Sequence, residues 1–209
     1  MTAQAFPSAL VALGIVLLLA PLVPGVARKT RAILTGRRGP PVWQLYADLR
    51  RLMLKGAVYS STTTGLFRLT PLVVWSTTIL ASAILPLDGQ RAPISFPGDA
   101  IAFAGLLALA RFFLVLGAFD TGSSFEGMGA SREVTFASLV EPGLFVAFVT
   151  LSVASGGLSL SGMLGAELWL RWAVVAPTMV LLAGSIFVLM LAECARVPVD
   201  DPATHLELT

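Results

Sequence analysis

Residues 99–118 read DAIAFAGLLALARFFLVLGA, twenty positions that are apolar except for Asp99 at the start and Arg111 within the segment. A bilayer core of about 30 Å requires about 20 such residues of helix, so this stretch predicts a transmembrane span. The same criterion predicts further spans at residues 6–27, 66–87, 136–155 and 168–192. We therefore expect an all-α, polytopic transmembrane helix bundle of about five spans, a single membrane domain over residues 1–209. Its loops on one side comprise residues 28–65, 119–135 and 193–209.

The composition supports a membrane protein. The chain is 56% hydrophobic and 12% charged, with a mean hydropathy of +0.85, which is more apolar surface than a soluble domain of this length buries. A net charge of +2 gives no indication of nucleic-acid binding. One cysteine, Cys194, and one histidine, His205, cannot form a disulfide, a structural zinc site or an iron-sulfur cluster within the chain. We expect any redox metal to belong to a partner.

Most of the basic residues lie on one side of the predicted spans. Nine of the fourteen precede the second span, and Arg132 and Arg196 follow the third and fifth, so 9 + 2 = 11 share a side. That side is predicted to be cytoplasmic, and Arg91 and Arg171 lie opposite. We expect a multi-pass protein of the cell (inner) membrane with its N-terminus outside. The nine are Arg28, Lys29, Arg31, Arg37, Arg38, Arg50, Arg51, Lys55 and Arg68.

The first cytoplasmic connection contains an amphipathic segment, PPVWQLYADLRRLM, at residues 40–53. Val42, Tyr46 and Leu49 share one helical face, whereas Asp48 and Arg51 lie largely opposite. This pattern predicts a helix in the cytoplasmic membrane interface. Whether its basic residues contact lipid head groups alone or also a partner stays open.

Arg111 lies about seven residues from the inner end of its span, or roughly 10 Å deep at about 1.5 Å per residue. A charge at this depth normally faces protein or water, and the alternative is that its long side chain reaches the head groups. Glu141 lies about five residues into the fourth span from the same side, and Glu193 closes the fifth. These side chains are candidates for one cluster, which either exchanges protons or is a fixed ion pair that joins helices.

The third connection, residues 120–135, contains Ser123 and Glu126 at the spacing of a capping box, which predicts the start of a short helix. Its Gly127 and Gly129 are too few for a phosphate-binding loop. Tight packing against a neighbouring segment is the better interpretation of these glycines.

Three segments carry a resemblance to a known family. The first is GRRGP at 36–40 followed by Gln44, Asp48 and Lys55; the second runs from DTGS at 120–123 through GASRE at 129–133 to Glu141-Pro142. The third is ECARVPVDDP at 193–202, then Glu207-Leu208. The chain resembles the membrane subunit of energy-converting group 4 nickel-iron hydrogenases and formate hydrogenlyases, which is homologous to the NADH dehydrogenase subunit 1 family of respiratory complex I.

The details favour the hydrogenase branch of this family. Ala203 and His205 stand where the complex I pattern has glutamates, and Gly56 follows Lys55 where relatives commonly have a glutamate. Quinone use is therefore less expected than in complex I. Relatives continue with further spans beyond the position of Leu208, so we expect this chain to lack them.

The resemblance implies a membrane-anchoring and proton-coupling subunit without a redox centre of its own. It would dock a hydrophilic arm, made of the large and small hydrogenase subunits with their nickel-iron and iron-sulfur centres, and adjoin antiporter-like membrane subunits. The alternatives are a quinone-site subunit of complex I type and a non-conducting membrane anchor. The candidates for contact with the arm are Arg37, Arg38, Asp120, Arg132, Arg196, Asp200 and Asp201. The candidates for a proton path are Glu141, Glu193, Arg111 and Glu133.

Overall fold

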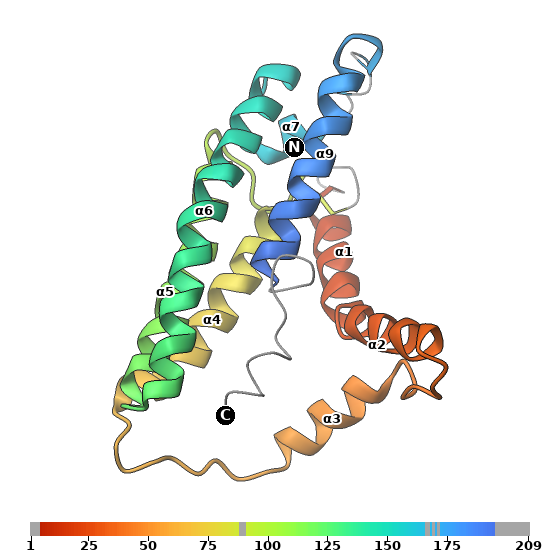
Figure 1. The fold of residues 1–209 in the computed structure, drawn as a ribbon. Coiled ribbons are helices and arrows are strands. Elements are labelled where there is room, and N and C mark those ends of the chain that lie inside the picture. The colour runs from red at the N-terminus through yellow and green to blue at the C-terminus, as the bar shows by residue number, and fades with distance from the viewer. Residues whose placement is uncertain (1–4, 88–90, 166–167, 169, 171, 195–209) are drawn as a thin grey trace. The chain divides into compact units, whose positions relative to one another are not determined.

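The computed structural model describes residues 5–87, 91–165, 168, 170 and 172–194, and all regular secondary structure within them is helical (Figure 1). Five helices in this part of the chain are long and apolar enough to cross a membrane, which confirms the predicted all-α bundle. The chain divides into two compact units, residues 1–59 and 60–209.

The first unit begins with α1 (Ala5–Leu19) and α2 (Leu22–Leu34). We expected one uninterrupted span at 6–27, but the helix breaks at residues 20 and 21. Pro21 and Pro24 have no backbone N–H, so the regular i−4 hydrogen bonds of this turn cannot all form. The Ala20 carbonyl instead accepts a hydrogen bond from the Val23 N–H at 3.3 Å. The sequence pattern located the apolar segment correctly and missed its break.

The amphipathic segment forms α3 (Gln44–Met53), as its periodicity predicted. Its apolar side chains remain exposed, with Leu52 at 62% and Met53 at 87%. The connection from α2 packs closely against α2 itself: a Cβ atom on Gly25 would lie 2.1 Å from the Val42 carbonyl oxygen. Only glycine permits this approach.

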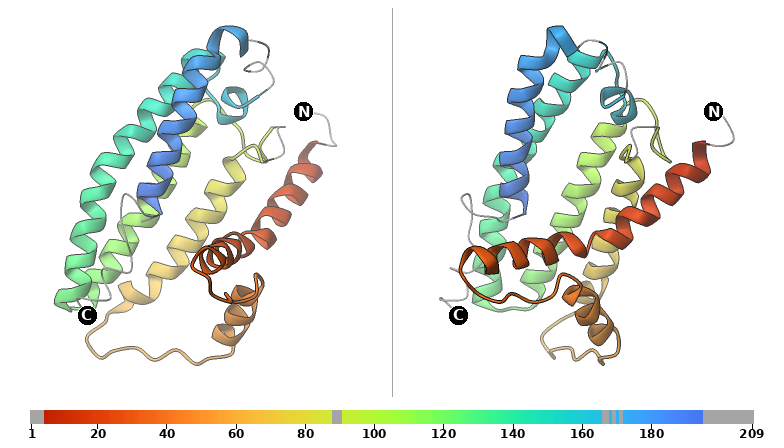
Figure 2. Two further views of the ribbon diagram at one scale, coloured as in Figure 1. Left: turned by 45° about the vertical axis from the view of Figure 1, so that its right-hand side comes forward. Right: turned by 90° about the vertical axis from the view of Figure 1, so that its right-hand side faces the viewer.

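The second unit consists of α4 (Gly65–Ile84), α5 (Asp99–Asp120), α6 (Ser124–Ser155), the short α7 (Leu160–Met163) and α9 (Trp172–Glu193). The long helices pack in chain order, α4 on α5, α5 on α6 and α6 on α9 (Figures 1 and 2).

The α6 helix differs most from expectation. We expected a loop at 119–135 and a span at 136–155, but one continuous helix begins at Ser124, with Ser123 at the predicted N-cap position. Its 32 residues extend about 48 Å at about 1.5 Å per residue, which exceeds the roughly 30 Å of a bilayer core. The turn from α5 is short because Gly122 adopts a φ of +71°, which favours glycine. Polarity of residues 124–135 suggested a loop, whereas their backbone is helical.

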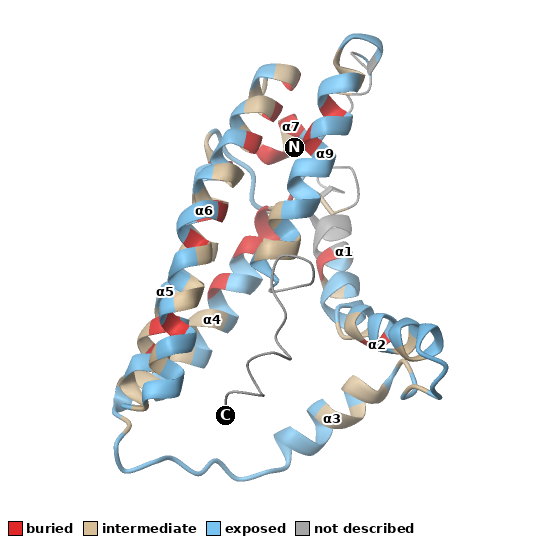
Figure 3. Ribbon diagram, viewed as in Figure 1, coloured by how far each residue is buried: buried red, intermediate tan, exposed pale blue. Residues whose placement is uncertain are grey.

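The buried core of the second unit lies at the end remote from the α5–α6 turn. It is formed by Ile84, Ala100, Ala147, Leu151, Leu160, Met163, Met179 and Leu182, and the buried positions gather there in Figure 3. Asp99 is fully buried in this region, where its carboxylate accepts hydrogen bonds from the Leu160 N–H at 2.6 Å and the Phe96 N–H at 3.3 Å. These bonds join α7 to the start of α5.

Candidate functional site

Arg111 on α5 holds the acidic side chains of two other helices. Within the described residues its guanidinium contacts three glutamates. Nε lies 3.2 Å from Glu133 Oε1 and Nη1 lies 3.0 Å from Glu141 Oε1, both on α6. Nη2 donates a hydrogen bond to Glu193 Oε1, at the end of α9. We refer to Arg111, Glu133, Glu141 and Glu193 as the Arg111 cluster.

The geometry of the α5–α6 hairpin explains why Glu133 belongs to the cluster. Arg111 lies 120 − 111 = 9 residues before the end of α5, and Glu133 lies 133 − 124 = 9 residues after the start of α6. Antiparallel helices joined by a short turn bring such equidistant positions side by side. Glu133 was expected in a loop, and only a helix that begins at Ser124 places it beside Arg111.

The cluster has a buried centre and an accessible edge. The Arg111 side chain is 10% exposed, whereas the three glutamate side chains are 35–43% exposed. Arg111 therefore faces protein, which contradicts the alternative that it extends to the lipid head groups. A guanidinium has five N–H donors and can hold several carboxylates at once.

The cluster lies level with the end of α9, which stops short of the α5–α6 turn (Figure 2). The 22 residues of α9 span about 33 Å, close to the thickness of a bilayer core of about 30 Å. A membrane crossed by α9 therefore has its boundary near Glu193, and the ends of α5 and α6 extend roughly 13 Å beyond Arg111.

A cavity of about 180 Å³ adjoins the cluster on the side toward the core. Ala104 and Gly105 of α5, Leu144 of α6 and Leu189 of α9 contribute to its apolar lining. Arg111, Glu141 and Glu193 close its charged end.

The docking candidates lie at separate places. Arg37 and Arg38 are exposed in the first unit, directly after Gly36. Arg132 on α6 has its guanidinium 5.7 Å from the centre of the Phe136 ring. Arg196, Asp200 and Asp201 lie outside the described residues.

Asp120 has an internal role at the end of α5. Its carboxylate accepts hydrogen bonds from the Thr64 N–H at 2.8 Å, the Thr64 hydroxyl at 2.7 Å and the Phe67 N–H at 3.1 Å. These donors include backbone groups that the start of α4 leaves without helical partners. Asp120 thus caps a neighbouring helix, a role that its own sequence context does not indicate.

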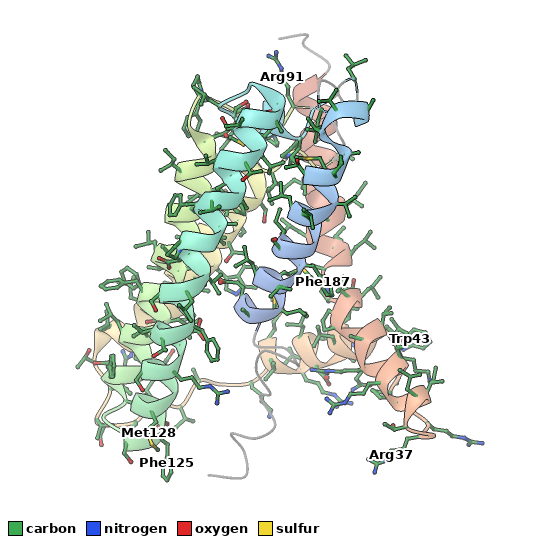
Figure 4. All side chains as sticks on the ribbon, turned by 45° about the horizontal axis from the view of Figure 1, so that its top comes forward. Arg37, Trp43, Arg91, Phe125, Met128 and Phe187 are labelled. Atoms are coloured by element: carbon green, nitrogen blue, oxygen red, sulfur yellow. The ribbon has the colours of Figure 1, made fainter. Side chains whose placement is uncertain are left out.

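The turn between α5 and α6 exposes apolar side chains that we did not select from the sequence. Phe125 is 52% and Met128 is 58% exposed, and both project from the first turns of α6 (Figure 4). An added Cβ on Gly127 or Gly129 meets no atom within 4 Å in the described structure. The expectation that these glycines pack tightly is wrong for this chain, because the surrounding surface is open.

Among the described residues, no group of three or more His, Cys, Asp or Glu side chains is arranged to hold a metal ion. The chemistry on view is the exchange or balance of protons by carboxylates around a fixed cation. The fold and site together define a multi-pass membrane protein with an ionised cluster at one end of its helices.

The comparisons with known proteins identify the family. A family model described as NADH dehydrogenase matches residues 7–209, so the chain belongs to the NADH dehydrogenase family, which includes subunit 1 of respiratory complex I.

Two relatives from Escherichia coli (strain K12) are similar over most of the chain. Hydrogenase-4 component C is 36% identical over 93% of this chain and 61% of its own length. Formate hydrogenlyase subunit 4 is 32% identical over 90% of this chain and 61% of its own length. A membrane subunit of the NADH-quinone oxidoreductase of Rickettsia prowazekii (strain Madrid E) is 25% identical over 97% of this chain and 63% of its own length. The chain thus spans about three fifths of the length of these relatives.

Proposed function

We propose that this chain is the membrane subunit of a hydrogenase-4 or formate hydrogenlyase type of complex, and that the Arg111 cluster exchanges protons as a docked hydrophilic arm transfers electrons. The observation that carries the proposal is the grouping of three glutamates from α6 and α9 around one nearly buried arginine. The chain is more similar to the two hydrogenase-type relatives than to the NADH-quinone oxidoreductase protein, which supports the choice of complex.

The charge balance of the cluster supports proton exchange. One guanidinium balances one carboxylate, so two further carboxylates remain whose charge protons can balance. All three side chains are about a third or more exposed, which gives water access to them, while Arg111 keeps them together when any one is protonated. A change of charge in a nearby redox arm alters the field at these carboxylates and hence their proton occupancy.

The arm would dock on the cytoplasmic ends of the helices. Phe125 and Met128 form an exposed apolar pair at the α5–α6 turn, and Arg132 lies one to two turns further along α6. An apolar centre with charged neighbours is the usual composition of a protein interface. A proton accepted at the cluster would pass sideways to antiporter-like subunits, because the cavity beyond it is lined mainly by apolar side chains.

The test of proton coupling uses Glu141→Gln in the assembled complex, reconstituted into vesicles. We expect proton translocation to fall at least tenfold while hydrogen chemistry continues, since the amide retains the shape of the side chain and cannot ionise. Glu126→Gln is the matched control, because Glu126 lies on the same helix, is exposed and is outside the cluster. Unchanged translocation in Glu141→Gln indicates the non-conducting anchor instead.

Docking is tested separately with the double substitution Phe125→Glu and Met128→Glu. We expect co-purification of the nickel-containing subunits to fall at least tenfold, because charges at the centre of an apolar contact oppose its desolvation. Glu141→Gln keeps these subunits bound. An intact complex after the double substitution contradicts docking at this turn.

A quinone-site subunit is the second candidate function, supported by the similarity to a protein of the NADH-quinone oxidoreductase. Extraction of the purified complex distinguishes the two. Stoichiometric quinone in the extract favours this candidate, whereas nickel and iron-sulfur subunits without quinone favour the hydrogenase-type complex.

A further inference from the structure

The cavity beside the Arg111 cluster has three walls from three helices. Leu107 and Ala108 represent the α5 wall, Leu144 and Phe145 the α6 wall, and Ile186 the α9 wall. The middle helix, α6, packs against both of the others, so the space opens between α5 and α9. At about 180 Å³ the cavity exceeds the roughly 150 Å³ of an apolar protein cavity that accommodates benzene. It is large enough for one aromatic ring or a short alkyl chain.

The end of this cavity is acidic. Arg111, Glu141 and Glu193 line it, and Glu133 contacts Arg111 from outside the lining. With all groups ionised, one positive charge faces three negative charges. Glu141 and Glu193 each contact the guanidinium through Oε1, and within the described residues their Oε2 atoms accept no hydrogen bond. Acceptor capacity and negative charge are thus both in excess at the mouth of an apolar space.

We propose that this cavity binds a small hydrophobic amine, with its ring or alkyl chain among the apolar side chains and its ammonium group donating hydrogen bonds to Glu141 and Glu193. A cation reduces the excess negative charge, whereas an anion increases it and a neutral analogue leaves it unchanged. Hydrogen bonds between an ammonium and carboxylates are among the stronger ones available in a partly desolvated site. This assignment goes beyond the proposed function and does not depend on proton movement.

The binding test uses three probes of similar shape and different charge. Benzylammonium, benzyl alcohol and benzoate are titrated at pH 7 into the purified full chain in dodecyl maltoside, and the dissociation constants are measured by calorimetry. We expect benzylammonium to bind at least tenfold more tightly than benzyl alcohol, and benzoate to bind more weakly than both. Equal affinity for the three probes overturns the proposal, because it shows no selection by charge.

Two substitutions locate the bound amine. Glu141→Gln should weaken benzylammonium at least tenfold, because a hydrogen bond to a charged group contributes more than a neutral one. Glu126→Gln, exposed on the same helix and outside the cavity, should leave the constant within twofold. If the two variants weaken binding equally, the amine responds to net charge alone and the assignment fails.

A further substitution fills the cavity and leaves its carboxylates in place. Gly105 lines the cavity, and a Cβ added there meets no atom within 4 Å, so Gly105→Leu is accommodated by occupying the ligand's space. It should weaken benzylammonium at least tenfold. Gly184→Leu is the control, because Gly184 on α9 is equally unobstructed and does not line the cavity. Circular dichroism verifies that both variants fold, and retained affinity in folded Gly105→Leu overturns the cavity as the site.

One further arm separates two sources of the ammonium group. Phosphatidylethanolamine added to the micelles competes with benzylammonium if the lipid head group occupies the site, whereas unchanged affinity assigns the site to free amines. The result is independent of proton coupling: Gly105→Leu tests the amine site alone, and translocation by Glu141→Gln vesicles tests the proposed function without added amine.

Discussion

Arg111 and Asp120 lie nine residues apart on α5, and each satisfies partners on another helix. Arg111 contacts glutamates of α6 and α9, and Asp120 accepts hydrogen bonds from the start of α4. Both therefore join helices through charge as well as through packing. Polar contacts of this kind matter within membranes because apolar burial between helices supplies little net driving force against lipid.

Loss of Arg111 should destabilise the second unit. Arg111→Gln leaves three carboxylates near one another without their cation, and we expect a loss of about 1–3 kcal/mol in the free energy of unfolding, below the figure for a fully buried pair because the glutamates are partly exposed. Thermal unfolding in dodecyl maltoside, followed by tryptophan fluorescence, measures the change. Arg91→Gln, in an exposed loop position, should change stability by less than about 0.5 kcal/mol. A variant as stable as the control contradicts a structural contribution of the cluster.

Asp120 offers a choice between capping and docking. Asp120→Ala removes acceptors at the start of α4, which should cost about 1–2 kcal/mol of unfolding free energy. Asp120→Asn should lose less, since its amide oxygen still accepts one of these bonds. Chemical denaturation of the purified chain measures both. If Asp120→Ala keeps full stability but releases the hydrophilic arm from the complex, its side chain serves docking and the capping interpretation is wrong.

At the scale of helices, two glycines set the close approach of neighbouring elements. A Cβ on Gly117 of α5 would lie 2.7 Å from Thr70 Oγ1 of α4, and one on Gly143 of α6 would lie 2.8 Å from Leu189 Cδ2 of α9. The two obstacles differ in kind. Thr70 is β-branched and its hydroxyl is bonded to the Leu66 and Phe113 carbonyls, whereas the end of a leucine side chain can move.

We therefore expect Gly117→Ala to destabilise the protein more than Gly143→Ala, by at least about 1 kcal/mol. Gly184→Ala is the control, because it adds the same methyl group to a helix without an obstacle within 4 Å and gains the helix propensity of alanine, about 1 kcal/mol. Thermal unfolding of the three variants under one set of conditions gives the order. Equal losses in Gly117→Ala and Gly143→Ala contradict the distinction between a fixed and a movable neighbour.

Helix type and span position followed from local sequence, and helix ends followed less well. The predicted span at 99–118 matches α5 (Asp99–Asp120) closely, because the free energy of placing apolar residues in lipid is set residue by residue. The extension of α6 to Ser124 was missed, since residues 124–135 are polar and a solvated helix has no apolar signal.

At the scale of the whole molecule, the distribution of charge predicts an orientation. Cys194 is the single cysteine of the chain and is exposed just after the end of α9, on the side predicted to be cytoplasmic. A membrane-impermeant maleimide should therefore label Cys194 in inside-out vesicles and leave it unlabelled in right-side-out vesicles. The extent of labelling is measured by mass spectrometry.

The control moves the cysteine to the opposite side. In the double variant Arg91→Cys and Cys194→Ser, the pattern of labelling should reverse, because residue 91 precedes α5 at the other end of the helices. Labelling of Cys194 only in right-side-out vesicles contradicts the predicted orientation and, with it, docking of the arm from the cytoplasm.

The sequence by itself determined the class of fold, the number of spans and the set of charged residues near one end of them. Apolar length and charge bias are properties of single segments, and depth along a helix follows from about 1.5 Å per residue, so Arg111, Glu141 and Glu193 were identifiable as neighbours in depth. The tertiary structure decided the rest: that Arg111 faces protein, that Glu133 joins the cluster, that Asp120 caps α4 and that a cavity adjoins the carboxylates. Those features depend on which faces of separate helices meet, and that is set by packing between segments distant in the chain.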